Sequence, residues 1–177
     1  MSFVFGGGVS GPATSVVPGV MNGWQDWNDA ATASSPIALS ATPADLTNDG
    51  AGPFTNLSYR VNGHGNIWNT STNRFDWTSL NLGDTVDVRI DVSVTTAGPN
   101  TDVSIAIDLA IGSGGDYTLG IDRRTFKNSG TFQIVRWYSV YMGDTNTLNN
   151  PAKFTIKSDG TGDTAVVNGW YVRTMVR

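Results

Sequence analysis

The stretch TVDVRIDVSV, residues 85–94, alternates between polar and apolar side chains over ten positions. The apolar side chains share one face and are Val86, Val88, Ile90, Val92 and Val94. A period of two is typical of a β-strand that has one face buried and the other in water. The stretch therefore predicts a long strand in an antiparallel sheet.

The same alternation returns in DVSIAIDLAI, residues 102–111, where Val103, Ile105 and Ile107 lie on the apolar face. Gly98-Pro99-Asn100 stands between the two stretches, and such a tripeptide is typical of a turn. We therefore expect the two stretches to form one long hairpin, and we expect their apolar side chains to be core residues.

The remaining composition favours the same kind of fold. Glutamate is absent, lysine occurs three times and glycine occurs 21 times, while Thr, Ser, Asn and Asp fill the polar positions. These residues favour turns and strands, whereas helix surfaces ordinarily carry Glu, Lys and Gln. Further strand patterns at regular spacing bring the expected total to about eight. The sequence predicts an all-β chain, an antiparallel β-sandwich of the jelly-roll type, over residues 34–177.

Residues 1–33 differ from the rest because they contain no Lys, Arg or His and only two Asp. Four isolated aromatic residues stand among Gly, Ser, Val and Pro, namely Phe3, Phe5, Trp24 and Trp27. Ordering such a segment costs roughly 1–2 kcal/mol per residue in backbone entropy, so it becomes ordered only if its aromatics find pockets. We expect an extended N-terminal anchoring arm; the alternative is a mobile tail.

FQIVRWYSVYM, residues 132–142, predicts a strand that is apolar on both faces. One face carries Phe132, Ile134, Tyr138 and Val140, and the other carries Val135, Trp137 and Tyr141. A strand of this kind is covered on both faces, and in a two-sheet sandwich the outer cover is another subunit. Val135, Trp137 and Tyr141 are therefore candidate subunit-interface residues.

Four tryptophans fall in or beside predicted strands, namely Trp68, Trp77, Trp137 and Trp170. Tryptophans in such positions fill a core or a protein interface, where they are enriched. The alternative for an exposed tryptophan is stacking against a sugar ring.

No constellation of residues predicts catalysis. The chain lacks cysteine, and its single histidine, His64, stands between two glycines in a predicted turn. Asp87 and Asp91 flank Arg89 on the polar face of one strand, which favours a cross-strand charge pattern over an acid–base pair, with a calcium contact as a minor alternative. We expect no enzyme activity, no cofactor and no metal site.

Charge and hydropathy exclude two classes of partner. The eleven Lys and Arg residues are scattered along a chain of net charge −4, so we expect no nucleic-acid-binding face. No apolar run approaches the length of roughly 18 residues that a membrane span needs, and residues 1–18 lack the basic start of a signal peptide, so we expect no membrane association.

An ordered set of short motifs resembles a jelly-roll domain found on the virions of tailed bacteriophages. The set consists of TNDG at 47–50, FTN at 54–56, LGD at 82–84, YMG at 141–143, NPA at 150–152, SD at 158–159 and VNGWY at 167–171. The resemblance covers about residues 36–176. The family includes capsid cement (decoration) proteins and the heads of fibres, and its members usually form trimers.

The resemblance implies a homotrimeric virion structural protein whose family is not recognised by catalytic residues. A short apolar leader without heptads favours capsid cement over a fibre head, which follows a long shaft. The capsid contacts are then Phe3, Phe5, Trp24 and Trp27, and the trimer interface contains Val135, Trp137 and Tyr141. We expect the chain on the capsid exterior, bound to the major capsid protein after synthesis in the bacterial cytoplasm. The alternatives are a fibre receptor-binding module for host surface polysaccharide and a free carbohydrate-binding or hydrolytic sandwich.

Overall fold

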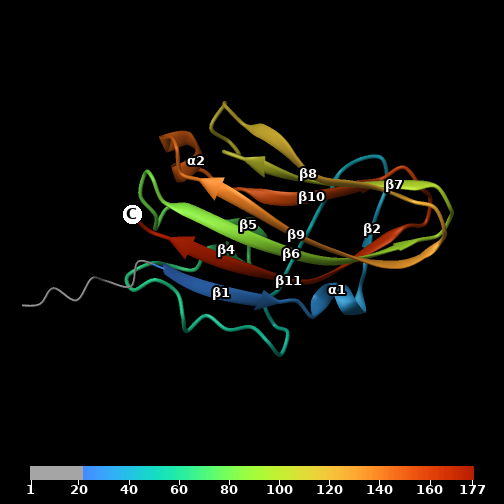
Figure 1. Ribbon diagram of the computed structural model, residues 1–177, viewed down its shortest axis with the longest axis horizontal. Coiled ribbons are helices and arrows are strands. Elements are labelled where there is room, and N and C mark those ends of the chain that lie inside the picture. The colour runs from blue at the N-terminus through green and yellow to red at the C-terminus, as the bar shows by residue number, and fades with distance from the viewer. Residues whose placement is uncertain (1–21) are drawn as a thin grey trace, which may run out of the picture.

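Two antiparallel sheets face each other in the computed structural model, which describes residues 22–177 (Figure 1). The strand order is β1–β11–β6–β9 in one sheet and β3–β10–β7–β8 in the other, and we call them the β1–β9 sheet and the β3–β8 sheet. The bounds are β1 (Asn22–Asn28), β3 (Ala44–Asp45), β6 (Thr85–Thr96), β7 (Thr101–Leu109), β8 (Tyr117–Phe126), β9 (Gly130–Tyr141), β10 (Lys153–Ser158) and β11 (Thr164–Met175).

These eight strands have the connectivity of a jelly roll. Numbered one to eight along the chain, they form one sheet in the order 1-8-3-6 and the other in the order 2-7-4-5. That order places two Greek keys across the two sheets, which defines the jelly roll. The predicted fold class is therefore confirmed.

The remaining elements are short. They are α1 (Ala31–Ser34), β2 (Ile37–Ala38), the hairpin of β4 (Trp68–Asn69) and β5 (Arg74–Phe75), and α2 (Thr145–Asn149). Within residues 22–177, no helix is long and apolar enough to cross a lipid bilayer.

The turn at residues 98–100 joins the two sheets. β6 pairs with β11 and β9, whereas β7 pairs with β10 and β8, so the predicted hairpin of these two strands is wrong. The predicted faces are nevertheless right, because the apolar sides of β6 and β7 face each other across the core. Alternation reports which side of a strand is buried and says nothing about its hydrogen-bonded neighbour.

The sandwich begins well before residue 34. β1 pairs with β11 along its whole length, from Asn22 opposite Met175 to Asn28 opposite Gly169. The predicted boundary between residues 33 and 34 is therefore wrong, and residues 22–33 belong to the folded domain. β1 was not predicted as a strand because the inward-facing residue Gln25, which is 2% exposed, interrupts the apolar alternation that is typical of a strand.

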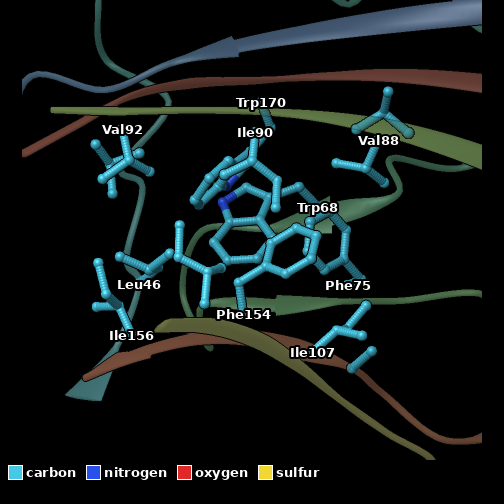
Figure 2. Packing of buried hydrophobic residues seen from close by; sticks show 14 of the residues in the cluster. Leu46, Trp68, Phe75, Val88, Ile90, Val92, Ile107, Phe154, Ile156 and Trp170 are labelled. Carbon is cyan, nitrogen blue, oxygen red and sulfur yellow. The ribbon is translucent and has the colours of Figure 1, made fainter. Parts of the chain in front are cut away.

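An aromatic cluster fills the core between the sheets (Figure 2). The ring of Phe75 lies 4.8 Å from Trp68, 5.3 Å from Trp77 and 5.1 Å from Phe154, measured between ring centres. Trp170 packs against Trp68 and Phe154. The predicted core positions around this cluster are all buried: Val86, Val88, Ile90, Val103, Ile105 and Ile107. Three of the four strand tryptophans are thus core residues, which leaves Trp137 on the surface.

Candidate interaction surfaces

The four aromatic residues predicted to contact a capsid have different surroundings. Phe3 and Phe5 lie outside the described residues. Trp27 is 5% exposed and belongs to the core of its own domain, so its prediction as a capsid contact is wrong. Trp24, on the opposite side of the same strand, is half-buried on the outer face of the β1–β9 sheet.

Most of the exposed large hydrophobic residues in the described part of the chain lie on the outermost strands β8 and β9. Of the eight exposed large hydrophobic residues in the described part of the chain, five lie on these strands, and we call them the β8–β9 edge: Tyr117, Leu119, Val135, Trp137 and Tyr141. Each strand pairs on one side only, so each presents a row of backbone amides and carbonyls that have no strand partner. The three residues predicted for a subunit interface are therefore on the surface, and two further apolar residues are exposed on the edge strand of the other sheet.

The two sheets separate along this edge. Phe126 stacks on Phe132 with their ring centres 4.4 Å apart, which closes the sandwich at one end of β8. At the other end, Tyr117 and Leu119 are each 40% exposed although they pair with buried core-side residues of β7. Apolar groups that face inward thus remain uncovered by the rest of the domain.

A row of aromatic rings crosses the outer face of the β1–β9 sheet. Residues 56–61 run along the free side of β1, where the amide of Trp24 donates to the carbonyl of Tyr59 at 2.8 Å. Trp24 stacks on Tyr59 at 4.7 Å and on Tyr171 at 5.6 Å, and Trp137 meets Tyr171 edge-on at 5.7 Å. We call these four residues the aromatic row.

Arg89 lies within the aromatic row. It is opposite Tyr171 on β11 and opposite Trp137 on β9, and its guanidinium carbon lies 5.5 Å from the centre of the tyrosine ring. That distance is typical of a cation–π contact. Within residues 22–177, its buried Nε has no hydrogen-bond partner and no carboxylate forms a salt bridge with it. The charge of Arg89 is therefore stabilised by a ring rather than by an acceptor.

The carboxylates beside Arg89 on β6 are engaged across strands. Asp87 accepts hydrogen bonds from Ser139 at 2.6 Å and from the Nε of Arg173 at 3.2 Å. Burial alone raises the pKa of Asp87, but these hydrogen bonds and the charge of Arg173 outweigh it and hold the pKa below its ordinary value. Asp91 accepts from the amide of Asn168 at 2.9 Å. These contacts agree with the predicted cross-strand charge pattern.

Asp26 lies on the other side of Tyr171 from Arg89. Register places Asp26 of β1 opposite Tyr171, which is in turn opposite Arg89. Burial raises the pKa of Asp26, and the positive charge of Arg89 offsets only part of that effect. No donor among residues 22–177 forms a hydrogen bond with this carboxylate. Within residues 22–177, the outer face therefore carries a carboxylate without a hydrogen-bond donor and a guanidinium without a salt bridge, on the two sides of one tyrosine.

Sequence reasoning did not group Tyr59, Asp26, Tyr171 and Arg89 into one surface. The outward direction of Arg89 followed from the alternation, but its neighbours depend on which strands pair and in what register. Tyr59 reaches the row from a loop, held by backbone hydrogen bonds that no side-chain pattern marks. The exposure of Tyr117 and Leu119 could not be predicted from the sequence either, because it comes from the separation of the two sheets.

These surfaces can bind a partner through aromatic stacking, hydrogen bonds and burial of apolar area. In the part of the chain that the structure describes, no group of three or more His, Cys, Asp or Glu residues is placed to hold a metal ion. His64 lies in a turn where its amide donates to the carbonyl of Val61 at 3.1 Å.

No family model and no curated protein matches this sequence. Among solved structures, the chain is similar to a chain of the infectious bursal disease virus Gt strain, with 9% identity over 89% of this chain and a TM-score of 0.48. The chain spans about a third of that longer viral chain, 34% of its length.

Two other similar structures are close to this chain in length. The PRD1 vertex protein P5 has 13% identity and a TM-score of 0.37, over 88% of this chain and 96% of that one. The CBM22-1 xylan-binding domain of Paenibacillus barcinonensis Xyn10C has 10% identity and a TM-score of 0.41, over 87% of this chain and 94% of that one. The solved structures similar to this chain thus include viral proteins and a carbohydrate-binding domain.

Proposed function

We propose that this protein is a structural protein of a bacteriophage particle, which decorates the capsid as a homotrimer and carries out no catalysis. The β8–β9 edge is the observation that carries the proposal. Soluble proteins ordinarily shield edge strands with charges or cover them, and exposed apolar clusters mark interaction sites. The resemblance of the ordered motifs to a jelly-roll domain of tailed-phage virions is a second support.

The shape of the β8–β9 edge suits a ring of identical subunits. Tyr117 and Leu119 lie on the core side of β8, whereas Val135, Trp137 and Tyr141 lie on the outer side of β9. Two different patches on one subunit favour a contact in which the first patch of one copy meets the second patch of the next. Such contacts close into a ring when the rotation between copies allows it, and a three-fold ring covers both patches on every copy.

Attachment to the major capsid protein is assigned to residues 1–21, through Phe3 and Phe5. The segment has no charged side chain, and it joins the sandwich at Asn22, at the same end of the β1–β9 sheet as Tyr141. Three such segments on one trimer make the second and third contacts intramolecular, which raises the overall affinity. Trp27 belongs to the core of the sandwich and plays no part in this attachment.

Val135→Lys is expected to convert the trimer into folded monomers. In a trimer the lysine ammonium would be buried against apolar groups, whereas in a monomer it lies opposite Asp91 on the neighbouring strand, which is a favourable cross-strand pair. Size-exclusion chromatography with light scattering should give three times the chain mass of 18.8 kDa for the unmodified protein and one chain mass for the variant. Leu82→Lys makes the same kind of change at a residue that is 52% exposed outside the edge, and it should leave the trimer intact. A monomeric unmodified protein would refute the proposed assembly.

Removal of residues 1–21 is expected to leave a folded trimer that no longer binds particles. The deletion ends before β1, so the pairing of β1 with β11 is kept. Binding can be measured by cosedimentation with particles that have been stripped of this protein, taken from the phage that encodes it. The full chain should sediment with the particles, and a Phe3→Ala, Phe5→Ala double variant should bind more weakly. Full occupancy by the shortened chain would show that attachment lies elsewhere.

A further inference from the structure

We infer that Asn62 is a site of spontaneous modification, at which the asparagine is converted into aspartate and isoaspartate through a cyclic succinimide. This inference does not depend on trimer formation or on capsid attachment. It rests on the unequal surroundings of the three Asn–Gly pairs in the sequence, which are Asn22–Gly23, Asn62–Gly63 and Asn168–Gly169. An asparagine that precedes glycine is prone to this reaction, because glycine has no side chain that shields its amide nitrogen.

The reaction joins groups of two adjacent residues. The backbone nitrogen of Gly63 gives its proton to hydroxide and attacks the Cγ of Asn62, and the side-chain amide leaves as ammonia. Water then opens the succinimide ring at one of its two carbonyl carbons. Opening at Cγ gives aspartate, whereas opening at the backbone carbonyl gives isoaspartate, in which the main chain runs through the former side chain. The net change consumes one water and releases one ammonia, and it needs no oxidant.

Both reacting groups are free at Asn62–Gly63. The pair forms the centre of a turn that is closed by the amide of His64, which donates to the carbonyl of Val61 at 3.1 Å. Within residues 22–177, neither the side chain of Asn62 nor the amide of Gly63 forms a hydrogen bond, and both residues are exposed. A Cβ placed on Gly63 would have no atom of this part of the chain within 4 Å beyond its immediate neighbours. The attacking nitrogen and the carbon that it attacks are therefore unobstructed.

At Asn22–Gly23 the attacking nitrogen is engaged in the ladder between β1 and β11. The amide of Trp24 points away from β11, because it donates to the carbonyl of Tyr59. Backbone groups alternate in direction along an antiparallel strand, so the amide of Gly23 points toward β11 and takes part in the ladder. A Cβ at Gly23 would also collide with the backbone of Val61, so the surrounding backbone leaves no room for the rearrangement.

At Asn168–Gly169 the side chain that would be attacked is held in place. The side-chain amide of Asn168 donates to Asp91 at 2.9 Å and to Ser93 at 3.0 Å. Rotation of this side chain toward the amide of Gly169 would break both hydrogen bonds. A Cβ at Gly169 would lie 2.7 Å from the carbonyl oxygen of Trp27, so the backbone also has little space. The structure thus leaves one of three chemically similar pairs open to reaction.

The modification places a new carboxylate beside Arg60. Asn62 and Arg60 line the same hollow on the surface. The Nη1 of Arg60 donates to the carbonyl of Leu57 and to the side chain of Asn66, each at 3.4 Å, and no carboxylate among residues 22–177 forms a salt bridge with it. Conversion of the neutral amide lowers the net charge of the chain by one unit, from −4 to −5, two residues away from this guanidinium group.

Peptide mapping of the aged protein tests the inference. The full chain is incubated at mildly alkaline pH and then cut with trypsin, which cleaves after Lys and Arg. The three pairs lie on three different peptides, residues 1–60, 61–74 and 158–173. Mass spectrometry with fragmentation locates the exchange of NH2 for OH, and labelling by an isoaspartyl methyltransferase detects isoaspartate. Asn62 should react about tenfold faster or more than Asn22 and Asn168, because those two react only when the sheet opens locally.

The unfolded chain and two variants serve as controls. In concentrated guanidinium chloride the three pairs should react at similar rates, since the fold no longer distinguishes them. Asn62→Gln should abolish the modification of the 61–74 peptide, because the longer side chain would have to close a larger and less favourable ring. Asn66→Gln makes the same change in the same peptide and should leave the modification unaltered.

Two results would overturn the inference. The first is a folded protein in which Asn22 or Asn168 reacts as fast as Asn62, which would show that the ladder and the side-chain hydrogen bonds do not select the site. The second is a folded protein in which Asn62 stays unchanged while the unfolded chain reacts, which would show that the turn protects this pair.

Discussion

Phe75→Ala is expected to lower the free energy of unfolding by about 3–5 kcal/mol, the largest stability effect that we expect of any substitution discussed here. Phe75 is fully buried and its ring contacts those of Trp68, Trp77 and Phe154. The loss combines the transfer of the ring out of the core with the cavity that it leaves between the two sheets. Since a domain of this size is stable by about 5–15 kcal/mol, this loss is a large fraction of its total stability.

Chemical denaturation followed by tryptophan fluorescence measures this effect. Phe54→Ala is the matched control, because the same side chain is removed at a position that is 76% exposed, and its loss should stay within about 0.5 kcal/mol. Phe75→Leu fills most of the cavity and should fall between the two. A loss below about 1 kcal/mol for Phe75→Ala would mean that the aromatic cluster is not the central packing unit of the sandwich.

Gln25→Leu is expected to cost about 2–5 kcal/mol, although it replaces a polar residue with an apolar residue of similar size in a buried position. The Oε1 of Gln25 accepts from the amide of Ile67 at 3.0 Å and from the indole of Trp27 at 3.3 Å, and its Nε2 donates to the carbonyl of Gly65 at 3.0 Å. Leucine leaves the buried amide of Ile67 and the buried indole of Trp27 without these hydrogen bonds, and it also removes the bond to the exposed Gly65. It also detaches residues 65–67 from β1.

The same denaturation experiment measures the effect, with Gln133→Leu on the exposed side of β9 as a control that should change little. Gln25→Glu adds a second check. An ionised glutamate cannot donate to Gly65, but a protonated one can, so this variant should recover stability as the pH falls toward about 4. Equal stabilities for Gln25→Leu and the unmodified protein would show that these hydrogen bonds contribute nothing net.

The long strands and their buried faces could be predicted from the sequence, whereas the pairing of those strands could not. Val88 and Ile105 both belong to clean alternating patterns, and both are buried as expected. Nothing in those patterns indicates that β6 and β7 belong to different sheets, because a turn at residues 98–100 serves a hairpin and a crossover equally well. Register is a property of the whole sheet and is settled by packing.

The candidate interaction surfaces could likewise be predicted from the sequence only in part. Trp137 could be identified as an outward-facing apolar residue because its own strand is apolar on both sides. Its position beside Arg89 and Tyr171 depends on three strands meeting in one register. The mistaken assignment of Trp27 has a local cause, since a buried glutamine two residues earlier hid the strand to which it belongs.

The antiparallel pairing of β1 with β11 has a mechanical consequence. Asn22 lies opposite Met175, so a force that draws these two residues apart opens the ladder from one end and breaks its hydrogen bonds one after another. A tension that enters at Asn22 along the direction of β1 and leaves through β9 acts differently. It shears β1 lengthwise against β11, so that all seven residue pairs resist together. The jelly roll should therefore resist a shear force carried across the β1–β9 sheet better than a force that separates Asn22 from Met175.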